Sequence, residues 1–420
     1  TTLAPHAPDR LLVGFDRTAT PADRVAARAR VAVSDTAPLS PLAPDVELWH
    51  LPTGLDVSRA VDAVSGLAGV RFAEPDYLVT TAATSNDPSF TNGTLWGMQG
   101  DTTSTVNVYG SQAAEAWGRG YTGSSSVAVG IVDEGIQITH PDLIDNIWVN
   151  LTEQNGTSGV DDDGNGYVDD INGWDFFNND ATVYNAGTIG AKGGNGIGVA
   201  GVNWNVTIVP AKFIGPTGGL ISDAVRALDY VTDLKARHQL RLVATNNSWT
   251  GGDYTQALAD AINRGGNADI LFVAAAGNST SNNNLVPSYP SNYQCTTATR
   301  LWDCVVSVAA IDGTGALGSF SNYGPTAVDI AAPGVAITST IPTNTYTSWN
   351  GTSMAAPHVT GTVALCAAAN PALTATQLRT AVLNTMVPTA SLSARTLLAG
   401  RLDTSSALRA CVGGSAPTGP

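Results

Sequence analysis

The residues with the clearest chemical potential lie in the stretch Asn350–Gly361, which reads Asn-Gly-Thr-Ser-Met-Ala-Ala-Pro-His-Val-Thr-Gly. Proline fits only the first turn of a helix, so Pro357 predicts a helix that begins close to Ser353. The Ser353 hydroxyl would then lie beside unpaired backbone N–H groups and the positive end of the helix dipole, which together stabilise an oxyanion. Ser353 is therefore a candidate nucleophile, and the alternative interpretation is a serine that caps a core helix.

Three other segments place polar residues where open α/β sheets keep their sites, at the carboxyl ends of strands. Each is an apolar or β-branched run that ends in a polar or glycine-rich turn: Val127–Gly135, Asn246–Gly252 and Ile270–Asn278. Together with the Ser353 stretch, these segments closely resemble the subtilisin-like serine peptidases, the subtilases. The resemblance extends from about Trp96 to Leu408.

For residues 95–411 the resemblance implies a subtilisin-like, three-layer α/β fold around a mainly parallel central sheet. It also implies peptide-bond hydrolysis, in which Ser353 attacks the carbonyl, Asp133 orients a histidine base, and Asn278 joins the Ser353 N–H in the oxyanion hole. An extended substrate would pair with an edge strand through main-chain hydrogen bonds. The residues expected to line its groove are Ser248, Trp249, Thr250, Gly251, Ala276 and Gly277.

The sequence departs from the family at the general base. In the family a segment His-Gly-Thr-His-Val-Ala-Gly carries this base as its first residue, whereas here Asn178–Asn185 leads directly into Ala186–Ala191. Aligned without a gap, the base position falls at Ala181, and aligned with a gap, the whole catalytic turn is deleted. The five histidines of the chain are expected to have other roles: His6, His50, His140, His238 and His358.

Two functions of different classes follow. The first is a secreted subtilisin-like endopeptidase precursor, which the retained Asp133, Asn278 and Ser353 favour. The second is a non-catalytic protein of the same fold that binds extended peptides or assembles with other extracellular proteins, which the lost histidine favours. We expect a subtilase homologue that is inactive or strongly impaired.

Calcium is the cofactor expected, and no redox or organic cofactor is expected. The resemblance places one calcium site in the segment after Asp133, and a glycine-rich turn without a metal is the alternative. Its oxygen ligands would be a carboxylate, a side-chain amide and three main-chain carbonyls. These come from Asp142, Asn195, Gly193, Ile197 and Val199.

A second calcium loop is predicted by the spacing of the segment Asp161–Asn172, which matches an EF-hand loop with glycine at its sixth position. Asn172 replaces the glutamate of the twelfth position, so Asp170 is expected to substitute for it. The other candidate ligands are Asp161, Asp163, Asn165, Tyr167 and Asp169. The alternative is a solvated acidic turn.

Residues 10–80 predict a separate small α+β domain. The expected elements are strands at 11–15, 46–51 and 70–73 and helices at 22–33 and 57–67. This pattern, which ends in Glu74-Pro75-Asp76-Tyr77, resembles the ferredoxin-like inhibitory propeptide of subtilases, and a generic accessory domain is the alternative. The propeptide would occupy the substrate groove with residues 79–83. A linker at 81–94, an extension at 1–9 and a tail at 412–420 complete the expected organisation.

Composition excludes some classes of partner. The 420 residues carry a formal net charge of −15 and only 13% charged residues, which argues against binding to nucleic acid or an anionic membrane surface. No apolar run approaches the length of a membrane span, and we expect a secreted protein whose signal peptide has been removed. Four cysteines fit an oxidising compartment. Cys295 is expected to pair with Cys304, while Cys366 either pairs with Cys411 or is a core thiol.

Overall fold

The computed structural model describes residues 6–40, 43–77, 84–184, 190–295 and 303–413. The chain divides into two compact units, 1–81 and 82–420. The first boundary therefore lies close to the end expected for the small N-terminal domain. Each unit has its own hydrophobic core and is described by itself.

The first unit is an antiparallel sheet covered by two helices, with strand order β2-β3-β1-β4. This is the expected ferredoxin-like arrangement, with one strand, β2, that was not predicted. Its sequence contains Pro38 and no β-branched run, and at the edge of the sheet proline costs no ladder hydrogen bond. The first strand also begins at His6, inside the segment expected as an extension. The elements are β1 His6–Phe15, α1 Pro21–Arg30, β2 Asp35–Ser40, β3 Ala43–His50, α2 Val57–Val64 and β4 Val70–Tyr77.

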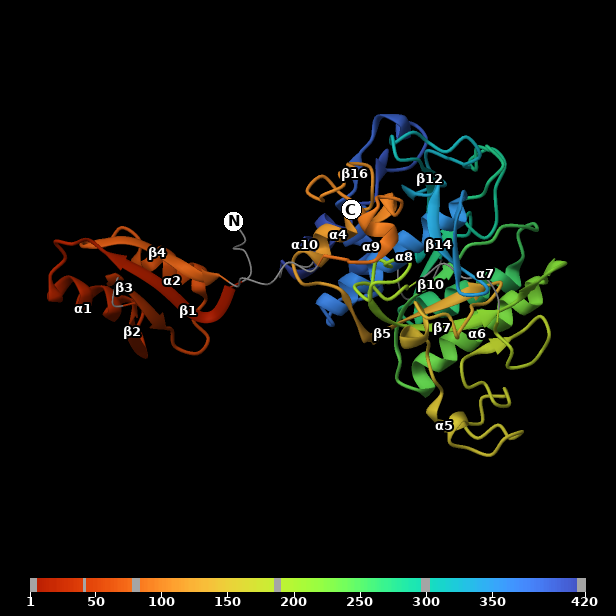
Figure 1. The fold of residues 1–420 in the computed structure, drawn as a ribbon, viewed down its shortest axis with the longest axis horizontal. Helices are drawn as coiled ribbons and strands as arrows, with labels where there is room; N and C mark the ends of the chain where they lie inside the picture. The colour runs from red at the N-terminus through yellow and green to blue at the C-terminus, as the bar shows by residue number, and fades with distance from the viewer. Residues whose placement is uncertain (1–5, 41–42, 78–83, 185–189, 296–302, 414–420) are drawn as a thin grey trace. The chain divides into compact units, whose positions relative to one another are not determined.

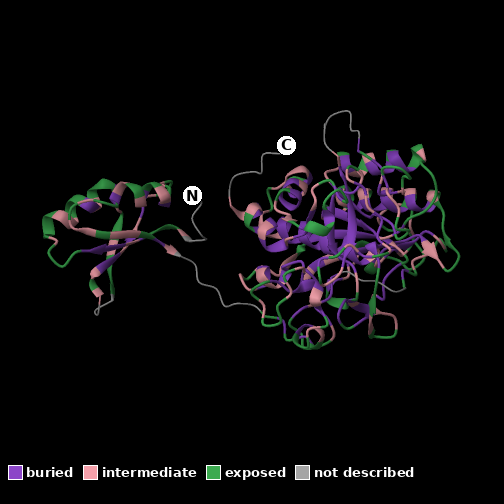
Figure 2. Ribbon diagram, turned by 90° about the horizontal axis from the view of Figure 1, so that it is seen from above, coloured by how far each residue is buried: buried purple, intermediate pink, exposed green. Residues whose placement is uncertain are grey.

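The second unit is built on a nine-stranded sheet with the order β16-β17-β13-β12-β11-β10-β5-β7-β6. All neighbouring strands pair in parallel except β16 and β17. Strands β11 and β12 are buried along their whole length, as strands covered on both faces must be. Figure 2 shows buried residues, in purple, concentrated in the middle of this unit. The strands are β5 Gly123–Asp133, β6 Trp174–Asp175, β7 Asn205–Lys212, β10 Arg241–Asn247, β11 Leu271–Ala275, β12 Val305–Ile311, β13 Ile330–Pro333, β16 Val387–Pro388 and β17 Gly400–Arg401.

Helices cover both faces of this sheet, which confirms the expected three-layer α/β fold. One face packs against α4 Ala113–Trp117, α8 Thr352–Ala369, α9 Ala375–Asn384 and α10 Thr404–Val412, and the other packs against α6 Ile221–Arg237 and α7 Gln256–Asn267 (Figure 1). Helix α8 is buried on nearly every side and consists mainly of small or apolar residues, as expected for a helix inside a core. Short elements complete the unit: α3 Pro88–Thr91, α5 Leu151–Gln154, β8 Ile214–Gly215, β9 Gly218–Gly219, β14 Ile337–Ile341 and β15 Thr345–Trp349.

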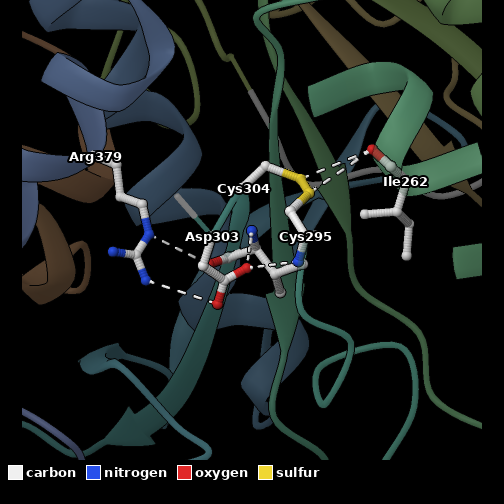
Figure 3. The surroundings of a disulfide bond; sticks show 6 residues. Ile262, Cys295, Asp303, Cys304 and Arg379 are labelled. Carbon is white, nitrogen blue, oxygen red and sulfur yellow. Dashed lines mark hydrogen bonds and ion pairs between the residues drawn. A yellow bond between two sulfur atoms is a disulfide. The ribbon is translucent and has the colours of Figure 1, made fainter. Parts of the chain in front are cut away.

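Two disulfides join elements of this unit. Cys295 pairs with Cys304, and the Asp303 carboxylate accepts the backbone N–H groups of Cys295 and Val305, at 3.0 Å each (Figure 3). Cys366 of α8 pairs with Cys411 of α10, so it is not a free core thiol. None of the described helices is both long and apolar enough to cross a membrane.

Candidate active site

Ser353 lies at the start of α8, as the sequence predicts. Its hydroxyl donates to the main-chain carbonyl of Ser248 at 3.0 Å, and the Ser248 hydroxyl donates to the Ser353 carbonyl at 2.9 Å. Pro357 lies inside the helix, one turn further in than predicted. Because proline has no N–H, the Ser353 carbonyl lacks its usual partner four residues on and is free to accept the Ser248 hydroxyl.

Asn278 follows β11 and is fixed by the first residue of α8. Its side-chain oxygen accepts the N–H of Thr352 at 2.9 Å and the Thr352 hydroxyl at 3.0 Å. This contact turns the amide nitrogen away from Thr352, and Asn278 is exposed. The Ser353 N–H, in the first turn of α8, is one of the donors that a helix leaves unpaired. The geometry thus fits an oxyanion hole made of the Asn278 amide and the Ser353 N–H.

Asp133 lies at the carboxyl end of β5, next to the same segment. Its carboxylate accepts the N–H of Glu134 at 2.9 Å and that of Ser248 at 3.3 Å. Burial raises the pKa of Asp133 to about 7; the Glu134 N–H opposes this rise, and the Glu134 charge adds to it. The structure therefore brings Asp133 and Ser353 to the same residue, Ser248. The Ser248 N–H donates to the Asp133 carboxylate, and the Ser248 carbonyl accepts the Ser353 hydroxyl.

The expected base position, Ala181, belongs to a segment anchored beside Asp133. The Ile136 N–H donates to the Val183 carbonyl at 2.8 Å, an approach that leaves no room for a side chain at Gly135. Lys212 pairs with Asp175 at 2.7 Å at the other end of the segment. Ala181 packs against the buried hydrophobic cluster that includes residues of α6. Its methyl group has no atom that can accept a proton. Residues 185–189, which follow, lie outside the described residues.

The three histidines of the second unit are each engaged elsewhere. The ring of His140 accepts the Asp142 N–H at 3.1 Å and packs edge-on against Tyr346. His238 contacts Asp163 at 2.9 Å. His358 is buried, its Nδ1 lies 2.9 Å from the carbonyl of Met354, and burial lowers its pKa to about 4. None of the contacts found for these three rings involves Ser353.

The predicted substrate edge follows β10, but one of its residues faces the core. Trp249 is buried and packs edge-on against Phe213, with ring centroids 5.0 Å apart, so its indole fills the core. Thr250 and Gly251 are exposed. On the other side, Ala276 is buried and the Gly277 N–H donates to the Thr352 hydroxyl at 3.1 Å.

The first predicted calcium loop is filled with hydrogen-bond donors. The Asp142 carboxylate accepts the amide of Asn195 at 2.8 Å, the N–H of Val199 at 3.1 Å and the hydroxyl of Tyr346 at 2.8 Å. The Asn195 side-chain oxygen accepts the N–H of Ile197. The side chains of Asp142 and Asn195 are thus bonded to each other, and calcium binding by these two residues with the carbonyls of Gly193, Ile197 and Val199 stays a prediction.

Asp87, which the sequence analysis did not single out, explains how this loop is held. Its carboxylate accepts three consecutive backbone N–H groups, those of Gly194, Asn195 and Gly196, at 2.8, 3.2 and 3.0 Å. Such a row of N–H groups binds an anion rather than a cation. The aspartate of Asn86-Asp87-Pro88 is the sequence feature that could have indicated this contact, but it lies far from the loop in the chain.

The second predicted calcium loop does bring carboxylates together. Oxygen atoms of Glu153, Asp163 and Asp170 lie within 4.8 Å of one another, and Glu153 and Asp170 are buried. Asp170, expected to take the place of the twelfth-position glutamate, belongs to this cluster, and burial raises its pKa to about 6 despite hydrogen bonds from Tyr230, Asn165 and Asn150. Glu153 was missed because it belongs to α5, before the loop begins.

Of the other predicted ligands of this loop, Asn165 joins the cluster, because its amide donates to the carboxylates of Asp163 and Asp170 at 3.2 and 2.9 Å. The side chains of the rest contact other groups. The Asp161 carboxylate accepts the N–H groups of Asn165 and Gly166, and that of Asp169 accepts the N–H of Gly159. The ring of Tyr167 packs against Trp174. Three buried or half-buried carboxylates in contact fit a hard divalent cation, since their mutual repulsion otherwise opposes folding.

Comparison with known proteins adds independent evidence. Residues 124–406 match the profile described as the subtilase family, and residues 2–76 match the fervidolysin N-terminal prodomain. The chain is 32% identical to the thermophilic serine proteinase of Bacillus sp. (strain AK1), over 74% of this chain and 67% of that protein. It is 35% identical to subtilisin DY of Bacillus licheniformis, over 64% of this chain and 86% of that protein.

A longer relative is subtilisin-like protease 1 of Plasmodium berghei (strain Anka), which is 31% identical over 66% of this chain; the chain spans only 49% of its length. Among solved structures, the chain is similar to one described as proteases from the bacterium Pseudoalteromonas arctica. That similarity has a TM-score of 0.60 and 26% identity, and it covers 78% of this chain and all of the other.

The raised pKa of Asp133 predicts how stability depends on pH. A folded-state pKa near 7, above the ordinary 3.8, means that the native carboxyl contributes stability at low pH that is lost as pH rises from about 4 to 7. Asn cannot ionise, so the Asp133→Asn variant should gain stability relative to the parent across this window, by about 2–4 kcal/mol at pH 8 before any loss of hydrogen bonds. Thermal unfolding at pH 4 and pH 8 measures this difference.

The exposed Asp253 offers a matched control, since Asp253→Asn makes the same substitution away from the site. Its effect on the melting temperature should be the same at both pH values. A pH-independent effect of Asp133→Asn would show that this carboxyl is ordinarily ionised in the folded protein.

Proposed function

The chain belongs to the subtilase family, and from this premise we propose that it is a subtilisin-like serine endopeptidase homologue that is inactive or strongly impaired. One observation carries the proposal: the Ser353 hydroxyl donates to a main-chain carbonyl, while a methyl side chain, Ala181, stands at the expected position of the base. Without a base, the hydroxyl is not deprotonated as it attacks a peptide carbonyl. No imidazolium forms to protonate the leaving amine either.

The size of the expected loss follows from the chemistry of the triad. In subtilisin, removal of the histidine alone costs on the order of 10⁶ in kcat, equivalent to about 8 kcal/mol of transition-state stabilisation. The oxyanion hole proposed at Asn278 and Ser353 supports a residual acceleration of roughly 10³–10⁴ over water. Asp133 retains its position, but it has no imidazole to orient.

Exposed residues beside the site and the presence of a prodomain favour a peptide-binding role. Thr250 and Gly251 are exposed and could pair with an extended peptide, although the Gly251 N–H already donates to the Tyr289 carbonyl at 3.0 Å and would have to exchange this bond. The prodomain matched at residues 2–76 is the natural occupant, and we propose that it stays docked in the groove. Residues 79–83, expected to occupy the groove, lie outside the described residues. The two disulfides support an oxidising, extracellular setting, in which other extracellular proteins are candidate partners.

Active-site labelling tests the loss of the base. Fluorophosphonate reagents need an activated hydroxyl, so Ser353 should remain unlabelled while an active subtilisin treated in parallel is labelled to completion. Intact-mass spectrometry should also show no self-cleavage between Thr80 and Pro88. Stoichiometric labelling that disappears in the Ser353→Ala variant would show that another residue supplies the base.

Docking of the prodomain has its own test. After the linker is cut by an added protease, the two fragments should still elute together in size-exclusion chromatography, because the groove interaction does not depend on the covalent link. Separate elution of the two fragments would refute the docked state, whether or not Ser353 is active.

We also propose that calcium binds at Glu153, Asp163 and Asp170. A ligand that binds only the folded state raises its stability by RT ln(1 + [L]/Kd), about 2.7 kcal/mol at a concentration one hundred times Kd. Millimolar calcium should therefore raise the melting temperature relative to excess chelator. Asp163→Asn should abolish that rise.

Asp142→Asn is the matched comparison, because it makes the same substitution at a carboxylate of the first predicted loop, which accepts the Asn195 amide and the Val199 N–H. This variant should keep the full response to calcium. Loss of the response in Asp142→Asn but not in Asp163→Asn would place the ion in the first loop instead.

A further inference from the structure

A pocket on the second unit, whose walls include none of the candidate catalytic residues, carries two neighbouring guanidinium groups. It has a volume of about 490 Å³ and lies between α4 and α10, which contact each other (Figure 1). Arg119 follows α4 and Arg409 lies in the last turn of α10. Both bond to Ser405: Arg119 to its carbonyl at 2.9 Å and Arg409 to its hydroxyl at 3.1 Å.

These two cations are not neutralised by a direct partner. Among the described residues, no carboxylate forms an ion pair with Arg119 or Arg409, although the chain has 35 acidic and only 20 basic residues. The Nε atom of Arg119 is buried and has no hydrogen-bond partner. Two positive charges bonded to the same residue repel each other, and their combined field attracts an anion.

The nearest carboxylates are already committed to backbone groups. Glu115, also in the pocket wall, accepts the N–H of Thr102 at 3.2 Å. Asp403 caps α10 and accepts the N–H and the hydroxyl of Ser406, at 2.8 and 2.7 Å. They reduce the positive potential of the pocket without pairing with either arginine. The second terminal nitrogen of Arg409 donates to the Ser406 hydroxyl at 2.6 Å, so the fork is held by two neutral hydroxyl groups.

The other residues that line the pocket indicate what kind of chemical group would carry the anion. Phe90 contributes an apolar surface and packs against the fully buried Trp117, with ring centroids 5.5 Å apart. Thr102 and Thr103 also line the pocket. Planar guanidinium forks match a carboxylate in two-point hydrogen bonding, and the aromatic wall favours an apolar body beside it.

We propose that this pocket binds an organic carboxylate with an apolar body, held at its charged end by Arg119 and Arg409. The C-terminal residue of a peptide has this chemistry, and a free carboxylic acid shares it. The site is independent of Ser353 and of the groove, so its occupancy does not depend on whether the protein cleaves peptides.

Calorimetry with three probes tests the chemistry on the full chain. N-acetyl-phenylalanine carries the carboxylate and the apolar body, its amide carries the body alone, and inorganic phosphate carries charge alone. The free acid should bind, and the other two should bind at least about tenfold more weakly. Equal binding of acid and amide, or of acid and phosphate, would overturn the proposal. A peptide that ends in phenylalanine, added in a separate titration, distinguishes a peptide terminus from a free acid by its tighter binding.

Arg409→Gln tests the site itself, since Arg409 is exposed and its replacement should not disturb folding. It should weaken binding of the acid about tenfold or more, whereas Arg59→Gln, an equal charge change at an exposed position of the first unit, should leave it unchanged. Arg119→Lys keeps the charge but loses the fork, so it should weaken binding less than Arg409→Gln. Equal affinities in the parent, Arg409→Gln and Arg59→Gln would show that the two arginines only support the fold.

Discussion

The candidate site depends on a single residue, Ser248, whose peptide groups link the side chains of Asp133 and Ser353. Its N–H holds the Asp133 carboxylate and its carbonyl accepts the Ser353 hydroxyl. Pro357 completes the arrangement, because its missing N–H leaves the Ser353 carbonyl free for the Ser248 hydroxyl. The link fixes Ser353 and Asp133 relative to each other without any histidine between them. It is therefore consistent with a site whose scaffold persists while its proton transfer is lost.

Buried charge explains how the scaffold beside Asp133 holds its shape. Lys212, opposite Asp133 in the β5–β7 pairing, is buried and pairs with Asp175. Asp175 also receives the N–H groups of Phe177 and Asn178, so the segment that leads to Ala181 starts from a satisfied ion pair. Breaking a buried pair costs about 3–5 kcal/mol because it leaves one charge uncompensated. This cost favours the segment staying in place whether or not catalysis occurs.

The sequence predicted the fold well because its signals were local. Buried β-branched runs marked β5, β10 and β11, and the Pro357 pattern marked the start of α8. Contacts between residues far apart in the chain escaped prediction. Asp87 binds a loop more than a hundred residues away, and Glu153 joins the acidic cluster from outside the loop with the EF-hand spacing. Trp249 was assigned to the groove from its position, but only packing against Phe213 shows that it faces the core.

The central claim is that Ser353 has no general base and is therefore not an activated nucleophile, and the rate of peptide hydrolysis with and without its hydroxyl tests this most directly. Triad residues act as a unit, so once the base is lost, removing the nucleophile costs little more. We expect kcat/KM on an extended peptide anilide to differ by less than about tenfold between the parent protein and Ser353→Ala. A parent protein faster than Ser353→Ala by roughly 10³ or more would contradict the account, because only an activated Ser353 gives such a difference.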